Sequence, residues 1–159
     1  GGVVAGVIMW GSGRGVFVGE LSGLVESCDA CSQYAGATAN SSGAAELSAQ
    51  MWAMPLALEH LGSYPVDRVC VRFDSTYAAN VTQATCHAKG HPTLAALAST
   101  LKIIVGMKVS LDFEHVEAHK GEPWNELVGA IPRAALESPS TRAMCVPPAC
   151  SWACYSDHE

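Results

Sequence analysis

The chain has 159 residues and a mass of 16.6 kDa, enough for one compact domain of ordinary size. Hydrophobic residues make up 49% of it and charged residues 15%, with a mean hydropathy of +0.19, which excludes an intrinsically disordered chain. The net charge of −6 argues against a strongly basic nucleic-acid binder. No apolar run reaches the roughly 18 to 20 residues of a membrane-spanning helix, so we expect no membrane partner.

The charges are unevenly distributed along the chain. Residues 1–59 hold one base and five acids, and residues 111–159 hold three bases and eight acids. Residues 60–110, in contrast, hold five bases and two acids. These bases are Arg68, Arg72, Lys89, Lys102 and Lys108. Because phosphate groups bind Lys and Arg, we expect any contact with a polyanion to use this middle third.

The seven cysteines are an odd number in a chain long enough to fold without disulfides, which predicts reduced thiols and an intracellular location, in the cytoplasm or nucleus. Cys28 and Cys31 form a CxxC pair. The residues that could complete a zinc site are loosely spaced near the end: Cys145, Cys150, Cys154 and His158. We therefore favour ordinary thiols in a loop and a tail, and keep a zinc-stabilised interaction domain as an alternative.

The first elements predicted along the chain are two strands. Residues 3–10 and 14–20 are rich in strand-forming side chains, and Gly-Ser-Gly at 11–13 supplies the turn of a hairpin. Residues 21–42 are rich in Ser, Gly and Ala, with one short strand expected near 33–38.

A long helix and a strand come next. Leucines and methionines recur at steps of three and four over residues 43–61, which predicts a helix capped by Ser41 or Ser42 and kinked at Pro55. Residues 69–74 alternate between apolar and polar side chains and predict a strand.

The remaining elements predict a parallel strand pair. We expect a short helix at 75–83 and a longer one at 92–106, followed by a strand at 109–116. A polar loop at 117–123 and a helix at 124–136 come next. A strand, a helical connection and a second strand form a parallel pair, so the hairpin and this unit together predict a mixed α/β sheet.

Two carboxylates stand at the ends of predicted elements. Asp74 ends a strand, and Glu46 lies near the start of the long helix that would pack across the same sheet. Converging carboxylates without thiol or imidazole ligands suit Mg²⁺ or Mn²⁺ and the phosphoryl chemistry of these ions. The alternative is that Glu46 is a solvated first-turn residue and that Asp74 caps the next helix.

A polar segment after the last strand has a distinctive spacing. His119, Gly121, Asn125 and Glu126 match the late motif His-x-Gly-x-x-x-Asn-Glu of type 1 ribonuclease H, and the chain resembles this family, particularly domains attached to retroelement reverse transcriptases. Three other pieces resemble the family in the same order: Gly1-Gly2 before a hydrophobic strand, Asn40 to Glu46-Leu47, and Phe73-Asp74-Ser75-x-Tyr77. The resemblance covers about residues 1–136.

The resemblance implies an α/β, ribonuclease H-like mixed sheet flanked by helices for residues 1–136. Its first strand would precede Gly1, and we expect that strand to be missing. Residues 137–159 are rich in Pro, Ser and Cys and predict a poorly ordered tail. The implied partners are an RNA/DNA hybrid or another nucleic acid and an upstream reverse transcriptase domain.

The resemblance also implies a two-metal endonuclease that hydrolyses the RNA strand of RNA/DNA hybrids with Mg²⁺ or Mn²⁺. Glu46 and Asp74 match the second and third of the family's four metal-binding carboxylates, Gly129 stands at the fourth position, and the first belongs to the missing strand. We therefore expect weak or single-ion binding and little or no hydrolysis by this chain. The alternative is a catalytically dead hybrid-binding module or a retroelement relic.

Further roles follow from the same resemblance. His119 would assist proton transfer beside the scissile phosphate. The side chains of Asn40, Ser75 and Asn125 would hydrogen-bond to sugar and phosphate groups of the hybrid.

Overall fold

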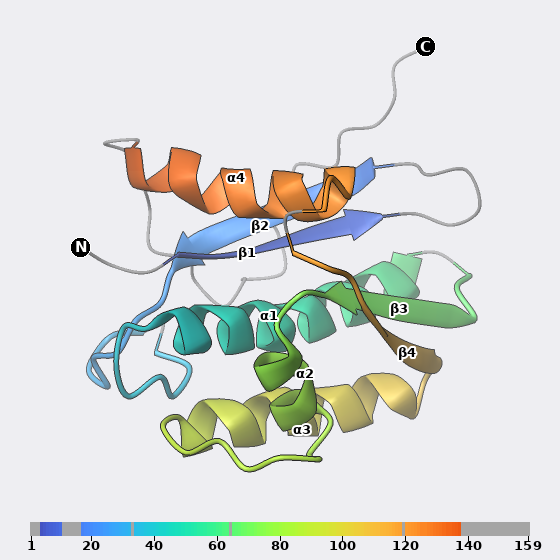
Figure 1. Cartoon of the computed structure of the whole chain (residues 1–159). Coiled ribbons are helices and arrows are strands. Elements are labelled where there is room, and N and C mark those ends of the chain that lie inside the picture. The colour runs from blue at the N-terminus through green and yellow to red at the C-terminus, as the bar shows by residue number, and fades with distance from the viewer. Residues whose placement is uncertain (1–3, 11–16, 33, 64, 119, 138–159) are drawn as a thin grey trace.

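The computed structural model describes residues 4–10, 17–32, 34–63, 65–118 and 120–137 (Figure 1). In chain order its elements are β1 (Val4–Trp10), β2 (Phe17–Leu24), α1 (Ser42–Ser63), β3 (Arg68–Phe73), α2 (Thr76–Thr82), α3 (Pro92–Gly106), β4 (Ser110–His115) and α4 (Pro123–Glu137). None of the helices in these ranges is both long enough and apolar enough to cross a membrane. The predicted tail lies outside the described residues, apart from Glu137, which ends α4.

Strands β1 and β2 form the predicted antiparallel hairpin, with Val4 opposite Leu24 and Met9 opposite Gly19. The described part of β2 extends four residues beyond the predicted end at residue 20, and the predicted turn lies outside the described residues. Helix α4 packs on the hairpin, and α1 contacts β1 (Figure 1). The hairpin is therefore covered by helices.

Strands β3 and β4 form the predicted parallel pair, from Arg68 opposite Ser110 to Phe73 opposite His115. The crossover contains α2 and α3, as predicted. Along β3, Val69 and its alternate neighbours are partly buried while Arg68 and its alternate neighbours are exposed, so one face of the pair is apolar and the other polar. The apolar face packs on α1 and α3.

The expectation of one mixed sheet is corrected by this structure. In the part of the chain described, the hairpin and the parallel pair are two separate two-stranded sheets with no ladder between them. Strands β1 and β3 each pair along one edge only, and α1 both contacts β1 and packs on the apolar face of β3 and β4. The fold is thus mixed α/β with antiparallel and parallel strands in separate ladders.

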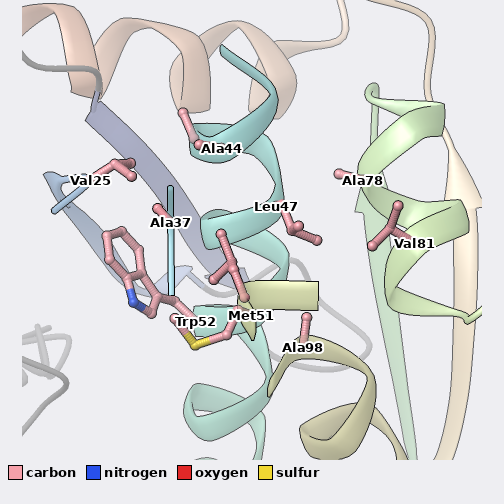
Figure 2. Close-up of a cluster of buried hydrophobic side chains, with 11 residues drawn as sticks. Val25, Ala37, Ala44, Leu47, Met51, Trp52, Ala78, Val81 and Ala98 are labelled. Carbon is pink, nitrogen blue, oxygen red and sulfur yellow. The ribbon is translucent and has the colours of Figure 1, made fainter. Parts of the chain in front are cut away.

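Helix α1 lies at the centre of the core. Its leucine and methionine stripe is fully buried at Leu47, Met51 and Met54. Figure 2 shows the cluster around it, in which Leu47 points toward α2 and Trp52 lies on the side of Val25. The helix begins as predicted, because the backbone N–H of Ala44 donates to Ser41 Oγ at 3.1 Å. Helix α1 also carries Glu46 to within electrostatic reach of Asp74, the residue after β3.

The short strand predicted near residues 33–38 is wrong. The described residues of this segment form a loop that packs against the start of α3. Gly36 has a φ of +99°, and a Cβ there would lie 2.6 Å from Thr93 Cβ. The backbone N–H of Thr38 donates to His91 Nδ1 at 3.1 Å. The Thr38 N–H therefore bonds to a side chain and not to a neighbouring strand.

Candidate metal and nucleic-acid site

The two predicted metal-binding carboxylates lie close enough for the charge of Asp74 to act on Glu46. Asp74 directly follows β3 and is half-buried, and Glu46 lies on α1 past its first turn. Loss of hydration and then the negative charge of Asp74 raise the pKa of the Glu46 carboxyl. The accessible surface of Glu46 nevertheless remains large, so a solute can reach the pair although protein atoms crowd the carboxyl.

Asn125 joins this pair from the start of α4. Its Nδ2 donates a hydrogen bond to Asp74 Oδ2 at 3.2 Å. This contact spans 51 positions of sequence and places a residue of the late motif beside a carboxylate of the central strand. Glu46, Asp74 and Asn125 therefore form one site, which we call the carboxylate site.

Of the other predicted site residues, the structure describes Ser75 and Asn40. Ser75 caps α2, because its Oγ accepts from the backbone N–H of Ala78 at 3.3 Å. The alternative in which Asp74 caps this helix is therefore wrong. Asn40 is exposed in the loop before α1. The predicted role of His119 concerns a residue outside the described part of the chain.

The sequence reasoning missed two residues next to the site, Glu122 and Arg72. Glu122 Oε2 accepts from the backbone N–H of Asn125 at 2.8 Å and so caps the first turn of α4. Arg72 Nη1 donates to Glu122 Oε1 at 2.7 Å. The Asn125 N–H, followed by Arg72, lowers the pKa of the Glu122 carboxyl. The spacing of an acid three residues before Asn125 is the capping signal that could have identified Glu122.

The carboxylate site offers part of the donor set that a divalent cation needs. Across the described ranges, no three His, Cys, Asp or Glu residues gather in a possible metal site. The carboxylate site supplies two hard oxygen donors, Glu46 and Asp74, which suit Mg²⁺ or Mn²⁺ when water completes the coordination. Their mutual repulsion, seen in the raised pKa of Glu46, would be relieved by a cation. The residues present thus fit one ion.

The CxxC pair does not have the properties of an activated thiol site. Cys28 and Cys31 are exposed, free thiols in a turn. The hydrogen bond with Cys28 is the main cause that raises the pKa of the Cys31 thiol, which disfavours the thiolate. The cysteines near the end of the chain lie outside the described residues.

The basic middle third is partly neutralised by acids from later in the chain. Arg68 Nε lies 2.6 Å from Asp112 Oδ2, and Arg72 is paired with Glu114 as well as Glu122. Of the five bases of the middle third, Lys89, Lys102 and Lys108, on or beside α3, make no ion pair within the described ranges. The expected polyanion contact is therefore reduced from five bases to three lysines.

Comparison of the chain with protein-family models, with curated proteins and with solved structures gave no match. The fold and the site by themselves define a mixed α/β domain with a solvent-accessible pair of carboxylates after a parallel strand.

Proposed function

We propose that the chain is a ribonuclease H-like domain that binds one divalent metal ion at Glu46 and Asp74 and contacts nucleic acid next to it. The observation that carries the proposal is the hydrogen bond from Asn125 to Asp74 beside Glu46. These residues come from three separate motifs of the resemblance, and chance motif matches would have no reason to meet in space. Their meeting at the end of a parallel strand is also where α/β folds bind ligands.

The roles of the side chains follow from their chemistry. Glu46 and Asp74 would hold Mg²⁺ or Mn²⁺, which supplies Lewis-acid stabilisation of a phosphate oxygen when bound. Asn125 orients the Asp74 carboxylate through its hydrogen bond. Asn40, exposed just before α1, is free to approach a sugar or phosphate group of a bound strand.

We further propose that hydrolysis by this chain is weak. Two ions at roughly 4 Å repel strongly and need several carboxylates to offset their charge. The carboxylate site has two, and Gly129 stands where the resemblance expects another. One weakly held ion is therefore favoured over a two-ion centre.

Titration of the labelled protein with Mg²⁺, followed by NMR, tests the metal site. We expect shifts of the amides around Glu46 and Asp74, a dissociation constant in the millimolar range, and a loss of affinity of at least about tenfold in Glu46→Gln and in Asp74→Asn. Glu59→Gln, which neutralises an exposed glutamate on the same helix, is the matched control and should bind like the unmodified chain. Equal affinity in all four proteins would contradict the proposed site.

A catalytically dead hybrid-binding module is the second candidate, and Gly129 is the observation that favours it. Such a module should bind an RNA/DNA hybrid equally well in EDTA and in Mg²⁺. The metal-dependent domain should bind the hybrid more weakly in EDTA, and it should cut the RNA strand slowly in Mn²⁺. Fluorescence anisotropy with a labelled hybrid, with duplex DNA as the comparison, separates the two.

A further inference from the structure

Helix α4 contacts the rest of the structure at two places. The body of the helix packs on β1 and β2. Its start, however, reaches the end of β3, where Asn125 contacts Asp74. Polar contacts, not apolar packing on the hairpin, therefore determine where Asn125 lies relative to the carboxylate site.

A continuous set of hydrogen bonds joins β3 to this turn. Arg72 Nη1 donates to Glu122 Oε1 at 2.7 Å, and Glu122 Oε2 accepts from the N–H of Asn125 at 2.8 Å. The same Asn125 donates through its side chain to Asp74 Oδ2 at 3.2 Å. The path begins and ends on β3 and its following residue, since Arg72 and Asp74 are two positions apart. A closed path of this kind leaves Asn125 little freedom.

Glu122 is suited to the central place in this path. Each of its two carboxylate oxygens has a different partner, one on the strand side and one on the helix side. Its side chain is 25% exposed and that of Arg72 is 46% exposed, so solvent partly screens this ion pair. Hydrogen bonds to charged partners are also shorter and stronger than neutral ones.

We propose that Arg72 and Glu122 are positioning residues of the carboxylate site: their ion pair anchors the first turn of α4 to β3 and so holds Asn125 against Asp74. The inference rests on the proposed metal site and adds to it two residues that contact neither the ion nor the nucleic acid. Loss of either charge frees the turn, and the Asp74 carboxylate then loses its orienting donor.

The chain offers a matched control for the strand side of the pair. Arg68 lies on the same exposed face of β3 and pairs with Asp112 at 2.6 Å. That pair joins β3 to β4 and does not involve α4. Arg68→Gln thus removes the same charge from the same strand without touching the path to Asn125.

The experiment compares Arg72→Gln, Glu122→Gln and Arg68→Gln at low salt by two readouts. The first is the NMR signal of the Asn125 side-chain amide, which reports its hydrogen bond to Asp74 without any metal. The second is the Mg²⁺ dissociation constant. We expect the first two variants to move the Asn125 signal toward that of free asparagine and to raise the dissociation constant about tenfold, because second-shell partners orient metal ligands. Arg68→Gln should change neither.

A double variant tests whether the effect passes through Asn125. If it does, Arg72→Gln should have no further effect on Mg²⁺ affinity in an Asn125→Ala background. The proposal would be overturned if the two substitutions reduced Mg²⁺ affinity additively. It would also be overturned if the Asn125 signal were unchanged in folded Arg72→Gln, or if Arg68→Gln changed the signal and the affinity as much as Arg72→Gln does. If the unmodified chain binds no Mg²⁺, the proposed metal site fails, and the Asn125 signal alone still decides whether the pair positions this residue.

Discussion

At the scale of single residues, Glu46 in the carboxylate site and Glu122 next to it have pKa values shifted in opposite directions. The pKa of Glu46 is raised by lost hydration and by Asp74, whereas that of Glu122 is lowered by its donors from Asn125 and Arg72. Ionised Glu46 is therefore disfavoured in the folded chain, and ionised Glu122 is favoured. The two glutamates therefore contribute to stability with opposite pH dependence.

The first prediction concerns Glu46→Gln and pH. A carboxyl whose pKa is higher in the folded state than in the unfolded state stabilises the fold at low pH. This contribution is fully present below the unfolded-state pKa of about 4.3, and it is lost as the pH rises through the folded-state pKa. In EDTA, Glu46→Gln should therefore melt at a higher temperature than the unmodified chain at pH 7, and the difference should shrink toward pH 4. Thermal unfolding followed by circular dichroism measures this.

Two further measurements make the Glu46 prediction specific. Added Mg²⁺ should raise the melting temperature of the unmodified chain but not that of Glu46→Gln. Glu59→Gln is again the control. A difference in melting temperature that does not change with pH would show that the effect is not electrostatic.

A second prediction at this scale concerns Gly36. Gly36 has a φ of +99°, and a Cβ at this position would lie 2.7 Å from Leu94 N. Gly36→Ala should therefore destabilise the fold by at least about 2 kcal/mol. A Cβ at Gly62, near the end of α1, would meet nothing within 4 Å, so Gly62→Ala should be neutral or stabilising by up to about 1 kcal/mol. Urea unfolding of both variants gives the comparison. Equal effects would rule out the close approach of the loop to α3.

At the scale of elements, the loop before α1 is held to α3 by His91. This buried side chain accepts from the Thr38 N–H through Nδ1, and its Nε2 lies 3.3 Å from Ser41 Oγ, the oxygen that caps α1. Thr38 Oγ1 also donates to the carbonyl of Gly90. The start of the helix that carries Glu46 is therefore joined to the start of α3.

The third prediction is that His91→Leu destabilises the fold by about 1 kcal/mol, because the Thr38 N–H loses its acceptor at a partly buried contact. His91→Asn, whose Oδ1 can take the place of Nδ1, should recover part of this loss. His87→Leu, at an exposed histidine of the same connection, should have little effect. Hydrogen exchange of the Thr38 and Ala44 amides should quicken in His91→Leu, and unchanged exchange would contradict the role of His91.

At the scale of the whole molecule, two small sheets and α4 are arranged around one buried helix. Helix α1 contacts β1 of the hairpin, and its alanine, leucine and methionine side chains pack against α2, α3 and the parallel pair. The three middle-third lysines that make no ion pair within the described ranges lie on or beside α3, which Figure 1 shows on the side opposite α4.

The fourth prediction is the salt dependence of hybrid binding. Each phosphate neutralised contributes about −0.9 to the slope of log affinity against log salt, so three lysines predict a slope no steeper than about −2.7. All five bases of the middle third would give about −4.5. Exchanging Lys89, Lys102 and Lys108 for Gln should flatten the slope, while Arg68→Gln should leave it unchanged. A steep slope in the triple variant would place the contact elsewhere.

Local patterns in the sequence determined most of the secondary structure. The hairpin, the cap at Ser41, the helix that begins at Pro92 and the parallel pair were all predicted, since periodicity and capping depend on neighbouring residues. The strand expected near residues 33–38 was not found, because Gly36 and Thr38 interact with α3, more than 50 positions away. No local pattern contains that information.

The sequence by itself also determined which carboxylates could form a site, since Glu46 and Asp74 belong to recognisable motifs. Only the tertiary structure decided that the charge of Asp74 acts on Glu46, that Asn125 donates to Asp74, and that Glu122 bonds to both Arg72 and the Asn125 N–H. It also decided that the strands form two ladders instead of one and that two arginines are neutralised within the chain. The reason is that pairing, ionisation and hydration depend on distances between residues far apart in sequence, whereas propensity and capping depend on neighbours.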